Sequence, residues 1–374
     1  MRKELLFAGI LSATTSLAHA QSSVTLYGLI DTGITFVSNQ GGSHNVQTSA
    51  GSLNGNRWGL KGAEDLGGGL SALFTIESGY GILDGKLKQG GRQFGRQAFV
   101  GLASTQYGTV TVGRQTSNIV DYLGPMSLPA GSWSNHPYDN DNLNNSFRVN
   151  NSVKYQSPTY GGLRFGGIYG FSNQAGGFSA NRTWNLGVDY AYGSLRFATS
   201  YLFVNHGGTS VNPSGAVSDD APFTAERQRT YGAGLNYAFG KTTVGLVFTQ
   251  TRLDNPVSIS GSASGRSGNL ALAGSSARFT NYEVNVRYNI TPAWMLLSSY
   301  TFTDANFNGV SPKFNQVNVE LDHLLSKRTD VYLQTIYQHV SGTGRSGITA
   351  DIDGLTASST NNQTAVTVGL RHRF

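Results

Sequence analysis

The strongest constraint on the fold of this chain is a repeated alternation of apolar and polar residues. In the segment 24–31, Val24, Leu26 and Ile30 share one face of an extended chain, and polar or amphipathic residues share the other. The segment 70–77 shows the same period of two. A period of two with one apolar face indicates a β-strand that lies between two different media.

About sixteen such segments follow one another, and the connections between them are alternately short and long. Short connections are expected at 66–69, 105–108, 158–162, 192–194, 239–241, 291–293 and 325–328. Long connections are expected near 39–52, 81–91, 116–147, 172–181, 206–226, 254–277, 304–312 and 341–360. A soluble sandwich has no reason to place every tight turn at one end, whereas a transmembrane barrel has short periplasmic turns and longer extracellular loops. The alternation of short and long connections therefore predicts an all-β, sixteen-stranded antiparallel transmembrane β-barrel.

Composition agrees with a barrel and argues against other membrane proteins. After the first twenty residues no apolar run of about 18 residues occurs, so no helical membrane span is expected. Mean hydropathy is slightly negative, as expected when the alternating faces of strands cancel each other. The chain has 49 glycines and no cysteine, and its formal net charge of +6 comes from basic residues spread along the sequence. A nucleic-acid-binding surface is therefore not expected.

The first twenty residues have the organisation of a secretory signal. Arg2 and Lys3 precede an apolar stretch at 5–17, and the small-residue site Ala18-His19-Ala20 follows. We expect cleavage before Gln21, which leaves a single barrel domain at residues 21–374. A buried N-terminal helix is the alternative interpretation of the same stretch.

The last segment, residues 364–374, alternates to the end of the sequence. Val366, Val368, Leu370 and Phe374 share one face, and that face ends on an aromatic ring suited to a membrane interface. Pairing of this strand with the strand that contains Val24 would remove both open edges, as a lipid environment requires.

The stretch from Gln115 to Phe147 is the exception to the alternation. Loops of this length within a compact domain are uncommon and usually either functional or disordered. This loop contains too many apolar residues, among them Ile119, Leu123 and Trp133, for a solvated tail. We therefore expect it to fold into the barrel and to narrow the pore.

Several short motifs, in their order and spacing, give the mature chain a resemblance to a known family. The motifs are Ser23-Val-Thr-Leu-Tyr-Gly28, Asn56-Arg-Trp-Gly-Leu-Lys-Gly62, Glu64-Asp-Leu-Gly67, Gly95-Arg-Gln-Ala-Phe-Val-Gly-Leu102, Gly113-Arg-Gln115, Asn151-Ser-Val-Lys-Tyr155 with Ser157-Pro158, and the terminal Phe374. Together they resemble the general porins of Gram-negative outer membranes, most closely the betaproteobacterial branch. The resemblance implies a sixteen-stranded diffusion channel, usually a homotrimer, with its third external loop folded inward. It also implies that Phe374 is an assembly signal and that lipopolysaccharide and other outer-membrane lipids surround the barrel.

A passive pore needs a charged constriction, not a nucleophile or a metal. Alternation places Arg57 and Lys61 on the lumen face, opposite Trp58 and Leu60. Periodicity does not settle the direction of Arg96, but the resemblance places Arg96 and Arg148 on the lumen wall as well. Arg114 and Arg92 are candidates for the periphery of this basic wall.

The opposing acids are expected in the loop, at Asp121, Asp139 and Asp141. Asp121 lies seven residues after Arg114, so the alternative that it anchors the base of the loop stays open. The loop lacks the Pro-Glu-Phe-Gly-Gly segment usual in enteric porins, and Leu29 stands where those porins tend to have lysine. Because few acids face several arginines, we expect small inorganic ions and hydrophilic solutes to pass with a preference for anions.

A diffusion pore is not the only function that such a barrel can serve. A more specific substrate channel, a structural or adhesive barrel and a barrel enzyme are the alternatives. The histidine–serine pairs that an enzyme would need are His323 with Ser326 and His339 with Ser341, and both are explained more simply as polar strand ends. Calcium could bind the oxygen-rich segments 139–142 and 351–354, although solvated loops are the simpler interpretation. We expect no cofactor, no metal and no enzymatic activity.

Overall fold

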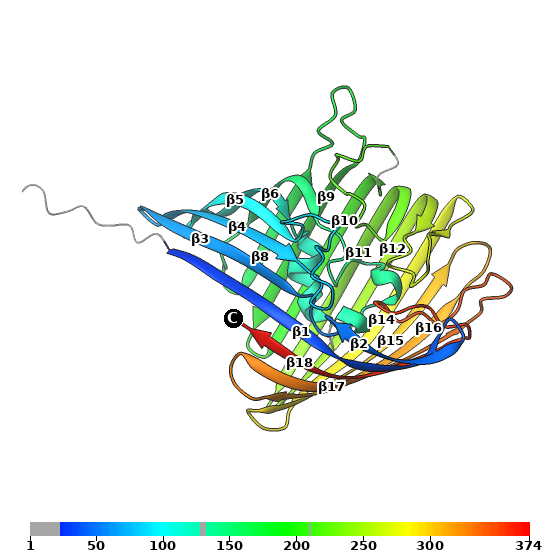
Figure 1. The fold of residues 1–374 in the computed structure, drawn as a ribbon. Coiled ribbons are helices and arrows are strands. Elements are labelled where there is room, and N and C mark those ends of the chain that lie inside the picture. The colour runs from blue at the N-terminus through cyan, green and yellow to red at the C-terminus, as the bar shows by residue number, and fades with distance from the viewer. Residues whose placement is uncertain (1–22, 128–131, 209–210) are drawn as a thin grey trace, which may run out of the picture.

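The structure is a computed structural model that describes residues 23–127, 132–208 and 211–374. The predicted signal at residues 1–20 lies outside these described residues. Figure 1 shows strands wrapped around a common axis, with several short helical segments between the walls. In the described part of the chain no helix is long and apolar enough to cross a membrane.

Strands account for most of the described chain. The first nine are β1 (Ser23–Gln40), β2 (Ser43–Ala50), β3 (Arg57–Gly67), β4 (Leu70–Gly79), β5 (Gln97–Ser104), β6 (Gly108–Gln115), β7 (Val149–Gln156), β8 (Leu163–Gly170) and β9 (Arg182–Tyr192). The others are β10 (Leu195–Gly207), β11 (Phe223–Phe239), β12 (Thr242–Ile259), β13 (Leu270–Ala271), β14 (Ser276–Asn289), β15 (Trp294–Asn306), β16 (Lys313–Leu324), β17 (Thr329–Ser341) and β18 (Asn362–Arg373).

These 18 strands form one antiparallel sheet that is closed by the pairing of β1 with β18. β2 and β3 pair with successive halves of β1, so they act as one interrupted strand of the wall. β13 has only 2 residues. Counting β2 and β3 as one strand and leaving out β13 gives sixteen strands in the wall, which confirms the predicted barrel.

The predicted alternation is present in the structure. Val24 and Leu26 are 63% and 58% exposed on the outside, whereas Asp31 and Thr35 are completely buried on the inside. All seven predicted short turns lie between consecutive strands. The long loop predicted near 39–52 is wrong, because β1 continues to Gln40 and a tight turn leads directly into β2. Gly41 and Gly42 supply the positive φ angles that this turn needs, and the irregular segment is 51–56 instead.

The barrel closes around the C-terminal residue. The backbone N–H of Gly28 donates to the Phe374 carbonyl at 3.0 Å, and the Phe374 N–H donates to the Gly28 carbonyl at 3.1 Å. A Cβ on Gly28 would lie 2.3 Å from the Phe374 ring, so the absence of a side chain lets the ring lie against β1. Phe374 thus covers the junction between the first and last strands.

The segment 116–147 contains four short helical turns instead of strands. They are η1 (Ile119–Leu123), η2 (Gly124–Met126), η3 (Ser132–Ser134) and η4 (Pro137–Asp139). Ile119, Leu123 and Met126 are fully buried in one apolar cluster with residues of β7, β8, β10 and β12. Met126 packs against Gly234 so closely that a Cβ there would approach it to 2.4 Å. The apolar half of the segment is therefore fixed to the wall.

Candidate pore constriction

A cluster of guanidinium groups lies where β3, β4 and β5 begin or end. Arg96 Nε lies 2.6 Å from Glu77 Oε1, and the Tyr27 hydroxyl donates to the other Glu77 oxygen at 3.0 Å. Arg57 Nε donates to the Gly55 carbonyl at 2.9 Å, and its charge interacts with those of Arg96 and Glu77. One carboxylate is thus shared between two arginines.

The position of Arg96 explains why periodicity did not settle its direction. β5 begins one residue later, at Gln97, so Arg96 is not bound by the alternation of that strand. Val100 and Leu102 are exposed on the outer face, whereas the Arg96 side chain contacts Glu77 on the inner face. The structure therefore places Arg96 beside Arg57.

Arg114 and Arg148 extend the cluster toward β6 and β7. Arg114 Nη2 lies 2.5 Å from Asp220 Oδ2, and Arg114 Nη1 donates to Asn150 Oδ1 at 2.5 Å. Arg148, only 3% exposed, interacts electrostatically with Arg96, Arg114 and Asp220. Its Nη1 donates to the Ser146 carbonyl at 3.3 Å, whereas its Nε has no hydrogen-bond acceptor among the described residues.

These residues define the basic cluster: Arg57, Arg96, Arg114 and Arg148 with the carboxylates Glu77 and Asp220. Four guanidinium groups and two carboxylates leave a formal charge of +2. Asp220 comes from the loop between β10 and β11 and was not predicted from the sequence. Its loop position, with no strand alternation around it, gave no sign that it meets Arg114.

Lys61 and Asp121 occupy the short-turn side of the cluster. Lys61 is exposed and its Nζ lies 5.4 Å from the centre of the Tyr27 ring. Asp121 pairs with Lys154 of β7 and accepts a hydrogen bond from Thr116 Oγ1 at 2.7 Å. Lys61, Asp121 and Lys154 line the same cavity. These contacts at the start of the loop favour the alternative that Asp121 anchors its base.

Asp139 and Asp141 are not open to the pore. They are 1% and 0% exposed. Asp139 accepts backbone hydrogen bonds from Asn144 at 3.1 Å and Ser146 at 3.0 Å, which hold a turn within the loop. Asp141 accepts from Thr249 Oγ1 of β12 at 2.5 Å. Because burial hides both carboxylates, neither presents a free negative charge to a passing ion.

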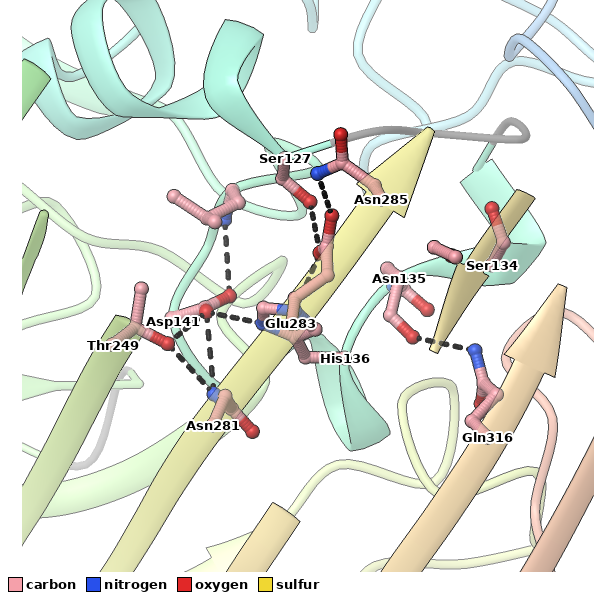
Figure 2. Close-up of polar contacts among 12 residues, drawn as sticks. Ser127, Ser134, Asn135, His136, Asp141, Thr249, Asn281, Glu283, Asn285 and Gln316 are labelled. Atoms are coloured by element: carbon pink, nitrogen blue, oxygen red, sulfur yellow. Dashed lines mark hydrogen bonds and ion pairs between the residues drawn. The ribbon is translucent and has the colours of Figure 1, made fainter. Parts of the chain in front are cut away.

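His136 joins the loop to the wall, as Figure 2 shows. Its Nδ1 lies 2.6 Å from Asp141 Oδ2, and its Nε2 lies 2.9 Å from Glu283 Oε2 on β14. Burial alone would lower the pKa of His136, but the charges and hydrogen bonds of Asp141 and Glu283 outweigh it and raise the pKa to about 10. An imidazolium between two carboxylates, here called the histidine clamp, therefore holds the loop at neutral pH.

Further contacts extend the attachment along the wall. Ser127 Oγ donates to Glu283 at 2.6 Å, and Gln316 Nε2 of β16 donates to the Asn135 carbonyl at 3.1 Å (Figure 2). The Trp133 N–H donates to the Ser52 carbonyl at 3.1 Å. The loop thus contacts β14, β16 and the segment between β2 and β3. The sequence could not indicate these partners, because each lies far from the loop along the chain.

A second charged cluster, which is acidic and lies on the neighbouring strands β16, β17, β18 and β1, was not predicted from the sequence. Glu320, Asp322 and Asp330 lie with Asp31 on the inner faces of β16, β17 and β1. Arg371 Nε lies 2.9 Å from Asp330 Oδ2, and Arg373 Nη1 lies 2.6 Å from Asp330 Oδ1. The acidic cluster is Asp31, Glu320, Asp322, Asp330, Arg371 and Arg373. Four carboxylates and two guanidinium groups leave a formal charge of −2.

The alternation in β16 could have revealed part of this cluster. Val317, Val319 and Leu321 alternate with Glu320 and Asp322, so two carboxylates in succession fall on the polar face. The alternation could not reveal that β16 lies near β1, because this proximity depends on closure of the barrel through β17 and β18.

The histidine–serine pairs considered for catalysis have other contacts. His323 stacks on Trp294 with ring centres 4.1 Å apart, and Ser326 Oγ accepts backbone hydrogen bonds from Arg328 and Thr329. His339 Nδ1 lies 2.8 Å from Asn362 Oδ1. Within the described residues no group of three or more His, Cys, Asp or Glu side chains could hold a metal ion.

Comparison with known proteins agrees with this architecture. The family model described as "Gram-negative porin" matches residues 8–344. An outer membrane porin protein of Bordetella pertussis is 32% identical, with 100% of both chains covered. The anion-selective porin from Comamonas acidovorans has a TM-score of 0.74 at 23% identity, covering 95% of this chain and 100% of that one. An outer membrane protein of Vibrio cholerae in a trimer form has a TM-score of 0.67 at 15% identity, covering 94% and 99%.

The family match spans most of the sequence, and the Bordetella relative aligns over its full length. The outer-membrane location and the passive channel function of this protein follow from these relatives and from the closed barrel. The chain belongs to the Gram-negative porin family.

Proposed function

We propose that the segment 116–147 narrows the pore of this outer-membrane channel and that the basic cluster makes the pore prefer anions. The observation that carries the proposal is the formal charge of +2 shared by Arg57, Arg96, Arg114, Arg148, Glu77 and Asp220. Lys61 adds an exposed positive charge on the same wall.

The physical mechanism is electrostatic focusing in a narrow passage. Charges on low-dielectric walls raise the local concentration of ions of opposite sign, because little water screens them. Guanidinium groups stay ionised at any working pH, so the positive wall persists. Weak contacts with several charged groups let an ion enter without being trapped.

The acidic cluster does not reverse the proposed anion preference. Asp322 and Asp330 are buried and pair with Arg371, so their charges are compensated locally. The acidic cluster adjoins the basic cluster along the wall, because β1 pairs with β3, which carries Arg57, so the two sets of charges would produce a field along that part of the wall. A dipolar solute would align in that field as it passes. Nothing in this arrangement favours an enzymatic role, and we assign the chain a transport function.

A planar-bilayer experiment tests the proposal. Purified protein should produce stepwise conductance increments, and the reversal potential in an asymmetric KCl gradient should report a preference for chloride. Zero conductance would contradict an open pore, and a cation-selective reversal potential would contradict the proposed charge mechanism.

We propose further that the mature chain begins at Gln21 and assembles as a homotrimer. The outer face of β1, β2, β5 and β6 supports an interface there, because its most exposed residues are aliphatic. They are Val24, Leu26, Ile34, Val46, Val100, Leu102 and Val112. Aromatic rings instead dominate the outer face of β9–β15, which suits contact with lipid. Conductance steps in groups of three and a trimer mass in native mass spectrometry would support this assembly.

The closure of the barrel predicts a role for Phe374 in assembly. Phe374→Ala should lower the folded fraction by about tenfold or more, because it removes the ring over Gly28 and exposes the junction of β1 with β18. Heat-modifiable electrophoretic mobility measures that fraction. Leu370→Ala, which removes apolar surface from the same face of β18, is the matched control and should fold nearly normally. Equal folding of both variants would contradict a special role for the terminal ring.

A further inference from the structure

A cavity of about 530 Å³ lies on the lumen side of the wall, next to the basic cluster. Residues of β1 and β3–β7 line it, and Thr116 and Asp121 close it at the base of the loop. Binding sites for small molecules typically have volumes of about 300–1,000 Å³. The cavity therefore has room for a small solute on the short-turn side of the constriction.

Strand register places a cation and two apolar residues together in this cavity. Lys61 on β3 is paired with Thr75 on β4, and Thr75 is paired with Phe99 on β5. Because neighbouring strands lie about 4.8 Å apart, the backbones of Lys61 and Phe99 are about 10 Å apart. In the next row toward the short turns, Leu73 is paired with Gly101. The absence of a side chain on Gly101 leaves room beside Leu73 and Phe99.

Leu73 and Phe99 form an apolar patch on a face that is usually polar in such barrels. Val100 and Leu102 are 61% and 51% exposed on the outer face, so alternation directs Phe99 inward. Leu73 and Phe99 both line the cavity and are partly exposed. Neither belongs to a buried apolar cluster of the described residues. The patch is therefore open to an apolar group of a solute.

Lys61 supplies the unpaired positive charge of the cavity. Its side chain is exposed and forms no ion pair with any residue that the structure describes. Lys154 also lines the cavity, but Asp121 pairs with it. Glu77 of the neighbouring basic cluster is held by Arg96. Among the described lining residues, two lysines and one carboxylate leave a formal charge of +1.

The polar groups on the loop side of the cavity are bonded to one another. Thr111 Oγ1 donates to Gln115 Oε1 at 2.6 Å, and Lys154 Nζ donates to the Thr116 carbonyl at 3.0 Å. Thr116 Oγ1 in turn donates to Asp121 at 2.7 Å. A polyhydroxylated solute would have to displace these bonds. One free cation beside an apolar patch instead suits a single carboxylate attached to a flat apolar body.

We propose that this cavity binds small aromatic monocarboxylates. The carboxylate pairs with Lys61 through a charge-assisted hydrogen bond, and the ring lies against Phe99 and Leu73. A second carboxylate on the solute would find no free cation, because Asp121 already pairs with Lys154. The inference deepens the proposed function and rests on it, since it assigns a solute class to the same anion-preferring pore.

The test measures equilibrium binding to purified, folded protein in detergent micelles by ligand-observed NMR. Benzoate, acetate and phthalate are the probes, and empty micelles give the background. Wild type should bind benzoate about tenfold more tightly than acetate, because only benzoate has a ring to bury. It should also bind benzoate more tightly than phthalate, whose second carboxylate stays unpaired.

Two variants separate the charge from the ring contact. Lys61→Gln should weaken benzoate binding about fivefold, because it removes the paired cation. Phe99→Thr should remove most of the difference between benzoate and acetate, since threonine keeps a strand-forming residue without the ring. The control Lys241→Gln removes one charge in the turn between β11 and β12, where Lys241 Nζ donates to the Ile290 carbonyl at 3.0 Å. This control should bind benzoate like wild type.

Equal affinity of wild type for benzoate and acetate, or unchanged benzoate binding by folded Lys61→Gln, would overturn the inference. Heat-modifiable mobility shows whether each variant folds. Because the NMR experiment measures binding without ion flow, the reversal potential of wild type reports on the proposed function separately. A chloride-selective pore that binds benzoate no better than acetate would overturn only this inference. A cation-selective pore that still prefers benzoate would contradict only the proposed anion preference.

Discussion

Arg148→Glu should shift the reversal potential in a KCl gradient strongly toward cation preference. The substitution changes the formal charge of the basic cluster from +2 to 0, since it removes one guanidinium and adds one carboxylate. A unit charge about 4 Å from an ion contributes about 1 kcal/mol even in bulk water, which is about a fivefold change in local ion concentration. We therefore expect the anion-to-cation permeability ratio to fall about fivefold or more.

Two further variants test whether the shift depends on the size and on the position of the charge change. Arg148→Gln should produce an intermediate shift, because it removes a charge without reversing it. Arg252→Glu makes the same change of charge on the outer face and should leave the reversal potential unaltered. The charge mechanism would be rejected if folded Arg148→Glu protein kept the wild-type permeability ratio.

Loss of the histidine clamp should have the second large effect. His136→Ala leaves Asp141 and Glu283 buried without their shared cation. Removing one partner of a buried ion pair typically costs about 3–5 kcal/mol, because the remaining charge is uncompensated. We expect the loop to detach from β14 for part of the time, seen as frequent conductance fluctuations in single-channel recordings at pH 7. His339→Ala, which changes an exposed histidine bonded to Asn362, should show no such conductance fluctuations. A steady trace from His136→Ala would show that the clamp is dispensable.

The clamp also predicts a dependence on pH. The folded pKa of His136, about 10, is above its ordinary value of 6.5, so the proton stabilises the closed loop. This contribution is fully present below about pH 6.5 and is lost as the pH rises through about 10. Wild-type channels should therefore become noisy only in alkaline solution. Because His136→Ala has no proton to lose, it should show no such transition, which separates the clamp from other groups that titrate at high pH.

The architecture could be predicted because its signals are local in the sequence. Alternation marked the strands of Val24 and Phe374, and tight turns marked their ends. The error at 39–52 has a local cause as well. Polar residues in β1 and β2 suggested a loop, whereas paired backbone groups and the turn at Gly41-Gly42 continue the hairpin to Gln40 and Ser43.

The site was predicted only in part. Which residues could be predicted depends on whether they lie inside a regular strand. Arg57 and Lys61 lie within a regular strand, where a period of two predicts that both side chains share one face. Arg96 stands outside β5, so periodicity did not predict its direction. The resemblance predicts the lumen side for Arg96, and its side chain contacts Glu77 in the structure. Asp139 and Asp141 were expected at the pore, but buried hydrogen bonds within the loop and to β12 hide their carboxylates.

By itself, the sequence determined the number of strands, the faces of most of them and the loop too apolar to remain in water. These properties depend on backbone pairing and on the difference between lipid and water, which act on neighbouring residues. Only the tertiary structure decided which charges meet. Asp220 reaches Arg114, Glu283 reaches His136, and the acidic cluster joins β16 to β1. Closure of the barrel brings together residues that are distant in sequence, and no local pattern records such encounters.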